Sequence, residues 1–282
     1  MRMRTLMGAG AAALTLIAAP AMAQDGEPAF DGVYVGGSFG YTVQNNDVGE
    51  TIEFDAGRNG SFGDTIATST GADAFSPGFC NGSATSQLSP AAGGRCTNDK
   101  DDWAYYGRVG LDSQRGRMVV GVVGEFGTSN ITDAVTAFSS TPASYVFNRG
   151  IDWEAGIRAR AGYTPNDTTL FYGTFGPGYA KIDRAFGSTN TTNVFTGSGK
   201  RNQFGIQGGG GIEQRIGSHV SIGLEYLYHQ YRDDDYVVRA AGSAGTPFTN
   251  ATNGGTTAGT DFIRTDEKFR WHSVRATLGF RF

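Results

Sequence analysis

Apolar and polar residues alternate along seven segments of this chain, and the apolar positions of these segments are free of charge. Side chains of a β-strand point alternately to opposite faces, so such alternation predicts strands with one apolar face. The seven apolar faces hold 39 positions without any Asp, Glu, Lys or Arg, although 18% of all residues are charged. The pattern therefore predicts an all-β protein, either a sandwich or a barrel.

An eighth segment, residues 170–180, has a less regular pattern. We assign Phe171, Phe175 and Tyr179 to the apolar face, and we expect a bulge or a strand end near Pro177, because proline cannot donate the ladder hydrogen bond. The seven clear segments are 33–43, 103–111, 118–126, 151–163, 204–212, 220–228 and 272–282.

The opposite faces of these strands carry four acids and four bases. A soluble sandwich would turn such residues to water and bury the apolar faces. A membrane barrel would do the reverse, and its interior charges would have to pair, because an unpaired buried charge is costly. We expect a structural network of paired charges in a barrel interior, with a gated proton or ion path as the alternative. The residues are Arg108, Glu125, Glu154, Arg158, Arg160, Glu213, Glu225 and Arg275.

The connections between the segments alternate strictly between short and long. Tight periplasmic turns and longer extracellular loops are typical of outer-membrane barrels. The longest apolar run, residues 118–123, is far shorter than the ~18–20 residues that a membrane helix needs. The sequence therefore predicts an eight-stranded antiparallel transmembrane β-barrel with large polar loops outside the cell. The short turns lie near 114–116, 165–167 and 217–218, and the long loops are 45–101, 129–149, 183–201 and 233–268.

The N-terminal residues 1–23 have the three parts of a secretory signal peptide. Arg2 and Arg4 are the basic part, residues 8–19 are the apolar part, and Ala21-Met22-Ala23 is a small-residue cleavage site. The apolar part is too short to span a membrane as a helix. We therefore expect export from the cytoplasm.

The remaining residues, 24–282, are expected to form one outer-membrane barrel domain. The formal net charge is −4 for the full chain and becomes −6 when the two leader arginines are removed. Nucleic-acid recognition needs a basic surface, so a nucleic-acid partner is excluded.

Cys80 and Cys96 are the only cysteines in the sequence, and both lie in the first long loop. In an exported chain, an even pair of cysteines predicts a disulfide. A bridge between them closes a loop of 15 intervening residues, worth about 3 kcal/mol in the chain-entropy model. A metal or redox role is the lesser alternative, since no histidine lies nearby.

Catalytic residues are sought among serine, histidine and acidic side chains. Ser221, Glu225 and His229 share one face of a predicted strand, but four residues along a strand span about 13 Å. A catalytic triad needs contacts near hydrogen-bond length, so these residues cannot form one. No enzymatic activity, cofactor or metal site is expected.

Acidic residues gather where the predicted strands meet the extracellular loops. Two interpretations remain open: a solvated rim that keeps the protein soluble, or oxygen ligands for Ca²⁺ or Mg²⁺ shared with the phosphates of lipopolysaccharide. The residues are Asp99, Asp101, Asp102, Asp233, Asp234, Asp235, Asp261, Asp266 and Glu267.

Several segments resemble the opacity-type and OmpA-type outer-membrane barrels, a porin-related class of Gram-negative bacteria. They are residues 30–37 (FDGVYVGG), 158–163 (RARAGY) and 224–228 (LEYLY). The C-terminal residues resemble the assembly signal of that class, which has apolar residues at alternate positions before a terminal aromatic residue. The matching positions are Val274, Ala276, Leu278, Phe280 and Phe282.

This resemblance implies location in the outer membrane, assembly by the outer-membrane assembly machinery, and contact with outer-membrane lipid and lipopolysaccharide. The interior of an eight-stranded barrel is just wide enough to be filled by side chains. We therefore expect a structural role in the cell envelope, or display of surface loops. The alternatives are a narrow porin-like channel for small solutes, and an adhesin that binds an unidentified extracellular ligand through its long loops.

Overall fold

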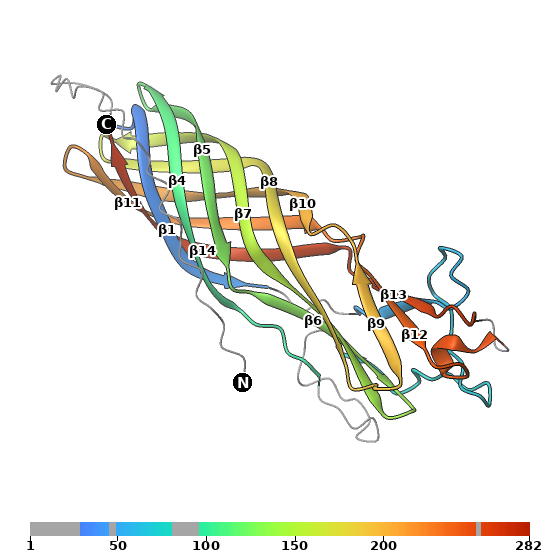
Figure 1. Cartoon of the computed structure of the whole chain (residues 1–282). Coiled ribbons are helices and arrows are strands. Elements are labelled where there is room, and N and C mark those ends of the chain that lie inside the picture. The colour runs from blue at the N-terminus through green and yellow to red at the C-terminus, as the bar shows by residue number, and fades with distance from the viewer. Residues whose placement is uncertain (1–28, 45–48, 81–95, 252–254) are drawn as a thin grey trace, which may run out of the picture.

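Eight strands pair with their neighbours to form a closed antiparallel barrel in the computed structural model (Figure 1). The structure describes residues 29–44, 49–80, 96–251 and 255–282, so the expected signal peptide lies outside the described residues. In these ranges the barrel strands are β1 (Gly32–Val43), β4 (Asp102–Arg115), β5 (Met118–Ser129), β7 (Ala143–Asn166), β8 (Thr169–Ser188), β10 (Asn202–Ile216), β11 (Val220–Arg232) and β14 (Lys268–Arg281).

The first and last strands close the barrel. β1 pairs with β14 on one side and β4 on the other, and the β7–β8 and β8–β10 ladders complete the ring. Three tight turns join β4 to β5, β7 to β8 and β10 to β11, as the sequence predicted. Two of them contain glycine with positive φ, Gly116 at 58° and Gly217 at 73°, a conformation that costs glycine little.

The outward face of the barrel is apolar. Val109, Ile157 and Leu278 are 51%, 63% and 57% exposed, which a water-soluble barrel would not tolerate over a whole wall. Phe171 and Phe175 also face outward, at 51% and 62% exposure, so the facing of the eighth segment is confirmed. Along the described residues, no helix is both long and apolar enough to cross a bilayer.

One position of the predicted apolar faces is wrong. Ile151 is buried although Trp153, two residues on, lies on the outer wall. The cause is a shift of register between Ile151 and Trp153 in the β7–β8 ladder. An extra residue in one strand reverses the alternation beyond it. The inward-facing side chains of β7 therefore switch from one alternating set of residues to the other at this bulge.

The expectation for Pro177 is also wrong, because β8 neither ends nor bulges there. The strand continues through Pro177 to Ser188, and the residue pairs with Ile206 of β10. On its other side the β7–β8 ladder has no pair between Gly156–Gly178 and Ala159–Phe175, and it resumes in the same register. The missing donor of proline thus removes a short part of one ladder.

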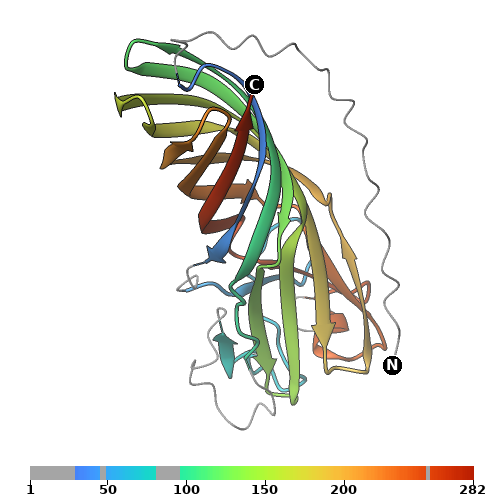
Figure 2. The same ribbon diagram turned by 90° about the vertical axis from the view of Figure 1, so that its left-hand side faces the viewer.

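The long loops are not simply polar loops, which corrects the sequence prediction. They form a folded cap beyond one end of the barrel, visible at the lower right of Figure 1 and below the barrel in Figure 2. β7 and β8 extend into it from the barrel. β6 pairs with β7, and β3 pairs with β6. A second sheet has the order β2-β13-β12-β9. The described cap elements are β2 (Ile52–Asp55), β3 (Gly78–Cys80), β6 (Thr132–Ser139), β9 (Asn193–Ser198), β12 (Val237–Gly242), η2 (Pro247–Thr249) and β13 (Thr260–Arg264).

Aromatic side chains form the core of the cap. Phe54 of β2 packs on Phe262 of β13 with ring centroids 4.9 Å apart, and Phe262 packs on Phe248 at 5.1 Å. Tyr145 and Phe147 of β7 reach the same core from the other sheet. Buried rings contribute large apolar areas to stability, so the cap has a core of its own beyond the end of the barrel.

Candidate functional site

The barrel interior contains the charged residues that the sequence assigned to it. The structure places all eight inside and buries each of them: Arg108, Glu125, Glu154, Arg158, Arg160, Glu213, Glu225 and Arg275. Asp112 and Arg281 are buried with them and were missed. Arg281 lies on the inward face of the predicted segment 272–282, and Asp112 lies one residue beyond the predicted segment 103–111; each is an even number of residues beyond Arg275 or Arg108. We call these ten residues the interior network.

The middle of the interior network is a cluster of three arginines around two glutamates. Arg275 Nη2 lies 3.0 Å from Glu225 Oε1 and 3.2 Å from Glu125 Oε2. Arg108 Nη2 lies 3.1 Å from Glu225 Oε2, and Arg158 pairs with Glu125. Each glutamate thus bonds to more than one guanidinium group, which is the geometry that offsets the cost of burying charges.

Nearer the tight turns, two arginines bind two acids. Arg160 Nη1 and Arg281 Nη2 each lie 2.9 Å from Asp112 Oδ2. Arg160 also pairs with Glu213 and donates to the Tyr34 hydroxyl at 3.2 Å. This group is electrically neutral when all four residues are ionised.

Glu154 lies nearer the cap, and none of the arginines that the structure describes lies within hydrogen-bond distance of it. Its carboxylate accepts hydrogen bonds from Tyr106 and Tyr231, and His229 Nδ1 lies 3.2 Å from Oε2. The Gln207 amide joins Glu154 to the middle cluster, because Nε2 donates to Glu154 at 3.1 Å while Oε1 accepts from Arg158 at 2.8 Å. The interior network as a whole balances five carboxylates with five guanidinium groups.

A serine, a histidine and an acid lie in line in this region, which the sequence did not reveal. Ser273 Oγ is 3.2 Å from His229 Nε2, and Glu154 is on the other side of the imidazole. Ser273 and His229 are diagonal neighbours on β14 and β11. All three side chains are buried, and Trp271 stacks on the histidine ring at 5.0 Å. A substrate cannot reach this serine, so we assign the three residues to the hydrogen bonding of the interior.

An aromatic layer and a second set of charges lie between this region and the cap. Phe269, Trp271 and Tyr231 belong to a buried apolar cluster. Above it, Arg149 Nε lies 2.7 Å from Asp133 Oδ2, and Arg264 Nη2 lies 2.6 Å from Asp133 Oδ1. We call the second set the rim network; its members are Glu50, Asp133, Arg149, Arg184, Asp233, Asp235, Arg264 and Asp266.

The rim network joins all four long connections of the barrel. Glu50 comes from the first, Asp133 from the second, Arg184 from the third, and Asp233 and Arg264 from the fourth. Arg184 Nε donates to Asp233 at 2.6 Å, and Arg264 Nε donates to Glu50 at 2.6 Å. Ion pairs between buried side chains therefore hold the four connections to one another.

Burial and ion pairing change the pKa values of the rim acids in opposite directions. Burial raises the pKa of Asp133, but Arg149 and Arg264 outweigh burial and hold this pKa at about 2. Burial raises the pKa of Asp99 to about 7, against the hydrogen bond that the Ala134 amide donates to it. Burial thus brings the pKa of Asp99, which lies beside the rim network, close to neutral pH.

The two interpretations of the acidic rim are answered in part. Asp233 is buried and paired with Arg149 and Arg184, so it does not belong to a solvated rim. Asp261 pairs with Arg239 at 2.7 Å on the cap surface. Within the described ranges, no three His, Cys, Asp or Glu residues are grouped to hold a metal ion.

The cysteines of the first loop are joined in a disulfide. Cys80 is the last residue of β3, and Cys96 lies further along the same loop. The Cα atoms of the two cysteines are 5.7 Å apart. Cys80 packs on Phe138 of β6. The bridge therefore closes a segment of the first loop beside the β3–β6 pairing, and this pairing joins the first loop to the second.

Outer-membrane proteins are among the known proteins to which this chain is similar in sequence. A 31 kDa outer-membrane immunogenic protein of Brucella melitensis is 28% identical over 111 residues, which are 39% of this chain and 46% of that protein. A 22 kDa outer membrane protein of Rhizobium leguminosarum is 28% identical over 141 residues, 49% of this chain and 58% of that protein. The chain thus spans about half the length of these relatives.

Among solved structures, the outer membrane protein OprG of Pseudomonas aeruginosa aligns with a TM-score of 0.47 and 11% identity, covering 89% of this chain and 96% of that one. The model of the outer membrane protein beta-barrel domain matches residues 9–282. This match covers nearly the whole chain and includes every strand described above. The chain belongs to the family of outer membrane protein beta-barrel domains.

Proposed function

We propose that this protein is a structural, non-enzymatic component of the outer membrane that displays a rigid cap at the cell surface. One observation carries the proposal: the four long connections meet in the rim network beneath a cap with its own aromatic core. A flexible loop needs neither feature. The cap is held by buried ion pairs and packed rings, so its described strands keep a fixed arrangement.

The filled interior supports this role over a channel. Open aqueous channels are found in barrels of about 16–18 strands, whereas eight strands leave room only for side chains. Here the inward side chains of the interior network pair across the lumen, and the aromatic layer of Phe269 and Trp271 lies above them. The naming of the Brucella relative as immunogenic is consistent with surface display.

The C-terminal strand supports recognition by the outer-membrane assembly machinery. In β14 the side chains of Val274, Leu278 and Phe280 face lipid, at 51%, 57% and 44% exposure. Ala276 and Phe282 lie on the same face. This is the alternating apolar face that the expected assembly signal requires.

Two measurements test the proposed function. Single-channel recording on refolded protein in planar bilayers is expected to show no stable conductance. Protease treatment of intact cells is expected to cut exposed cap residues and leave the barrel whole. A steady conductance that changes in Glu154→Gln would assign a channel instead, and a cap shielded from protease in intact cells would contradict display.

A further inference from the structure

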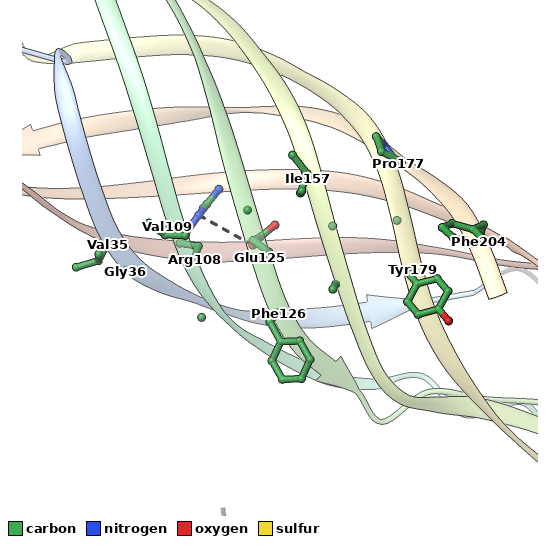
Figure 3. A pocket seen from close by; sticks show the side chains of 15 residues that line it. Val35, Gly36, Arg108, Val109, Glu125, Phe126, Ile157, Pro177, Tyr179 and Phe204 are labelled. Carbon is green, nitrogen blue, oxygen red and sulfur yellow. Dashed lines mark ion pairs between the residues drawn. The ribbon is translucent and has the colours of Figure 1, made fainter. Parts of the chain in front are cut away.

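One large apolar side chain of the cap is strongly exposed. On the barrel wall, exposed apolar residues face lipid, and Figure 3 shows Val109, Phe126 and Ile157 there, around a groove of about 920 Å³. Val194 of β9 is 65% exposed, but it lies in the cap, beyond the end of the barrel. Among the described cap strands it is the one large apolar side chain with such exposure. Val194 thus marks β9 as the cap strand whose apolar surface is least covered.

β9 is the last strand of the second cap sheet and pairs on one side only. Its partner is β12, in a ladder that runs from Asn193–Gly242 to Ser198–Val237. Within the described part of the chain, no backbone group of residues 194–198 bonds to anything outside that ladder. The other edge of β9 therefore offers free N–H and C=O groups, to which an extended chain can add.

The opposite edge of the same sheet is protected. At β2 the amides of Gly63 and Asp64 donate to the Phe54 carbonyl at 3.0 and 2.9 Å. The Asp64 carboxylate accepts from the Ala56 amide at 2.9 Å. Proteins usually protect sheet edges by covering loops, charges or proline, but β9 has the sequence NVFTGS and contains neither a charge nor a proline. The sheet is thus closed at β2 and open at β9.

The neighbouring part of β8 is unpaired on one side as well. β8 pairs with β10 as far as Lys181–Asn202, and the Ile182 amide donates to the Arg201 carbonyl at 2.8 Å. Beyond this point β8 pairs only with β7, and β9 pairs only with β12. The two strands run side by side from their connection (Figures 1 and 2) without forming a ladder. We call the stretches 183–188 and 193–198 the fork.

Asp235 fixes the base of the fork. Its carboxylate accepts from the Lys200 amide at 2.9 Å and from Arg184 Nη2 of β8 at 2.9 Å. Gly199 has a φ of 140°, and a Cβ there would lie 2.5 Å from the Asp235 carbonyl oxygen, so this approach requires glycine. Side-chain hydrogen bonds therefore hold β8 and β9 at this point, in place of a ladder.

The inner side of the fork is aromatic. The rings of Phe186 on β8 and Phe195 on β9 have centroids 5.1 Å apart, and Tyr236 packs on Phe147 at 5.8 Å. Phe186, Phe195 and Tyr236 are only partly buried, whereas Phe147 is fully buried in the cap core. An added strand with apolar side chains at alternate positions would cover these rings.

One cation lies at the end of β9 that is nearer the barrel. Lys200 is exposed, and none of the described acidic groups forms an ion pair with its ammonium group. The two other bases nearby are matched. Lys181 Nζ lies 2.7 Å from Asp152 Oδ2. Arg201 Nη1 lies 3.6 Å from Asp183 Oδ1. Lys200 thus leaves a positive charge beside the fork that is complementary to an acidic partner residue.

We infer that β9 binds an extended peptide of a surface partner, which adds antiparallel to its free edge. The partner peptide has apolar residues at alternate positions, over Phe186 and Phe195. It begins with an acidic residue, because the start of an antiparallel strand lies beside the end of β9, where Lys200 is. A second copy of β9 does not match, since the residues before Asn193 are Thr191 and Thr192. The inference rests on the proposed display of the cap, which lets a partner reach the fork.

Fluorescence anisotropy with a labelled synthetic peptide tests the charge. The probe alternates valine and threonine after an N-terminal aspartate, and the full chain is refolded in detergent micelles. The wild type is expected to bind this probe about fivefold more tightly than a probe that begins with lysine, the effect of one exposed ion pair. Lys200→Glu should reverse this preference. Lys268→Glu, at an exposed lysine that starts β14 and pairs with Arg232 of β11, is the control and should keep it.

Two further probes test the backbone pairing without changing the protein. Each is N-methylated at alternate residues, one probe along each edge of the peptide. One of them should bind like the unmodified probe, and the other should lose about tenfold in affinity or more, because it cannot donate to β9. Alternate amides of β9 should exchange their hydrogens fast in the free protein and slowly with the probe bound, whereas β2 should not change.

Three results would overturn the inference: equal binding of the two N-methylated probes, slow exchange of all β9 amides before any probe is added, or the same preference in Lys200→Glu as in Lys268→Glu. In micelles the cap is accessible from every side. A failure of display in intact cells therefore leaves these measurements unaffected, and a failure of peptide binding leaves the protease test of display unaffected.

Discussion

Arg264 and Asp133 connect the two sheets of the cap through a hydrogen bond of 2.6 Å between Nη2 and Oδ1. Arg264 ends β13 and Asp133 lies near the start of β6, so the pair joins elements that are far apart in the sequence. Both side chains are buried. The packing of the two cap sheets on each other therefore depends on a charge pair that water does not screen.

Replacing Arg264 by methionine should loosen the cap while the barrel stays folded. The change leaves Glu50 and Asp133 buried with fewer partners, a loss of roughly 3–5 kcal/mol for a buried pair. Trypsin cleavage within the cap, measured on protein in vesicles, should accelerate accordingly. Arg239→Met is the control, because Arg239 pairs with Asp261 on the surface and such pairs contribute about 0–1 kcal/mol. Equal protease sensitivity of the two variants would show that the rim network does not hold the cap.

The stability of the cap should fall as the pH rises from 5 to 8. The pKa of Asp99 is about 7 in the folded protein and 3.8 for the unperturbed group, so the folded state holds a proton that the unfolded state releases. The stabilisation by this proton is complete below pH 4 and is lost as the pH rises through 7. Asp99 is partly solvated, so the change should be on the order of 1–2 kcal/mol.

Asp99→Asn tests the pH effect, because asparagine resembles the protonated acid. Urea unfolding of the cap should depend less steeply on pH in this variant. Asp133 does not interfere, since its pKa of about 2 lies below the measured range. An unchanged slope in Asp99→Asn would assign the pH dependence to another group, with Glu50 the first to examine because burial raises its pKa too.

Reducing the disulfide should destabilise the first loop and leave the barrel intact. A thiol reagent should label Cys80 and Cys96 only after reduction. Loss of the bridge removes about 3 kcal/mol in the chain-entropy model, so β3 should exchange its amide hydrogens faster. Labelling of either cysteine in unreduced protein would contradict the pairing.

The barrel could be predicted from the sequence because a single rule, alternation along a strand, governs every membrane-spanning segment. The rule placed Arg158 inside and Ile157 outside. Extended past the end of the second segment along its inward face, the same rule would also have found Asp112. It failed at Ile151, where one extra residue reversed the phase, and nothing local to that residue marks a bulge.

The cap could not be predicted because its strands are short and its core forms between distant segments. Phe54 and Phe262 pack together only after β2 and β13 pair, and strands of four and five residues are too short to show a clear period. The expected partners of Arg158 were Glu154 and Glu225. The structure places Arg158 Nη2 3.6 Å from Glu225 Oε1, pairs Arg158 with Glu125 as well, and connects it to Glu154 only through Gln207.

Deleting Phe282 should impair assembly rather than the stability of the assembled barrel. Phe282 packs on Phe280 at 5.1 Å and is 52% exposed, so its removal disturbs few interior contacts. Cell fractionation should show less protein in the outer membrane and more precursor or aggregate in the periplasm. Normal insertion of the shortened chain would contradict the assembly signal, and Phe282→Trp, which keeps a terminal aromatic residue, is the control.

Neighbouring substitutions on β7 should reveal opposite environments. Ile157 is 63% exposed on the lipid face and Arg158 is 1% exposed inside. Ile157→Arg should destabilise the barrel by roughly 2–4 kcal/mol, the cost of arginine on a lipid face near the midplane. Arg158→Leu should destabilise it through a different cause, because Glu125 loses a partner in the interior. Urea unfolding in lipid vesicles measures both free energies.

A double substitution separates these two causes. Because Arg158 and Glu125 are in contact, adding Glu125→Gln to Arg158→Leu should recover part of the loss, whereas adding it to Ile157→Arg should be close to additive. If Ile157→Arg is harmless and Arg158→Leu stabilises the protein, the apolar face points to a core and the charges point to water. In that case the closed barrel would not lie in a membrane.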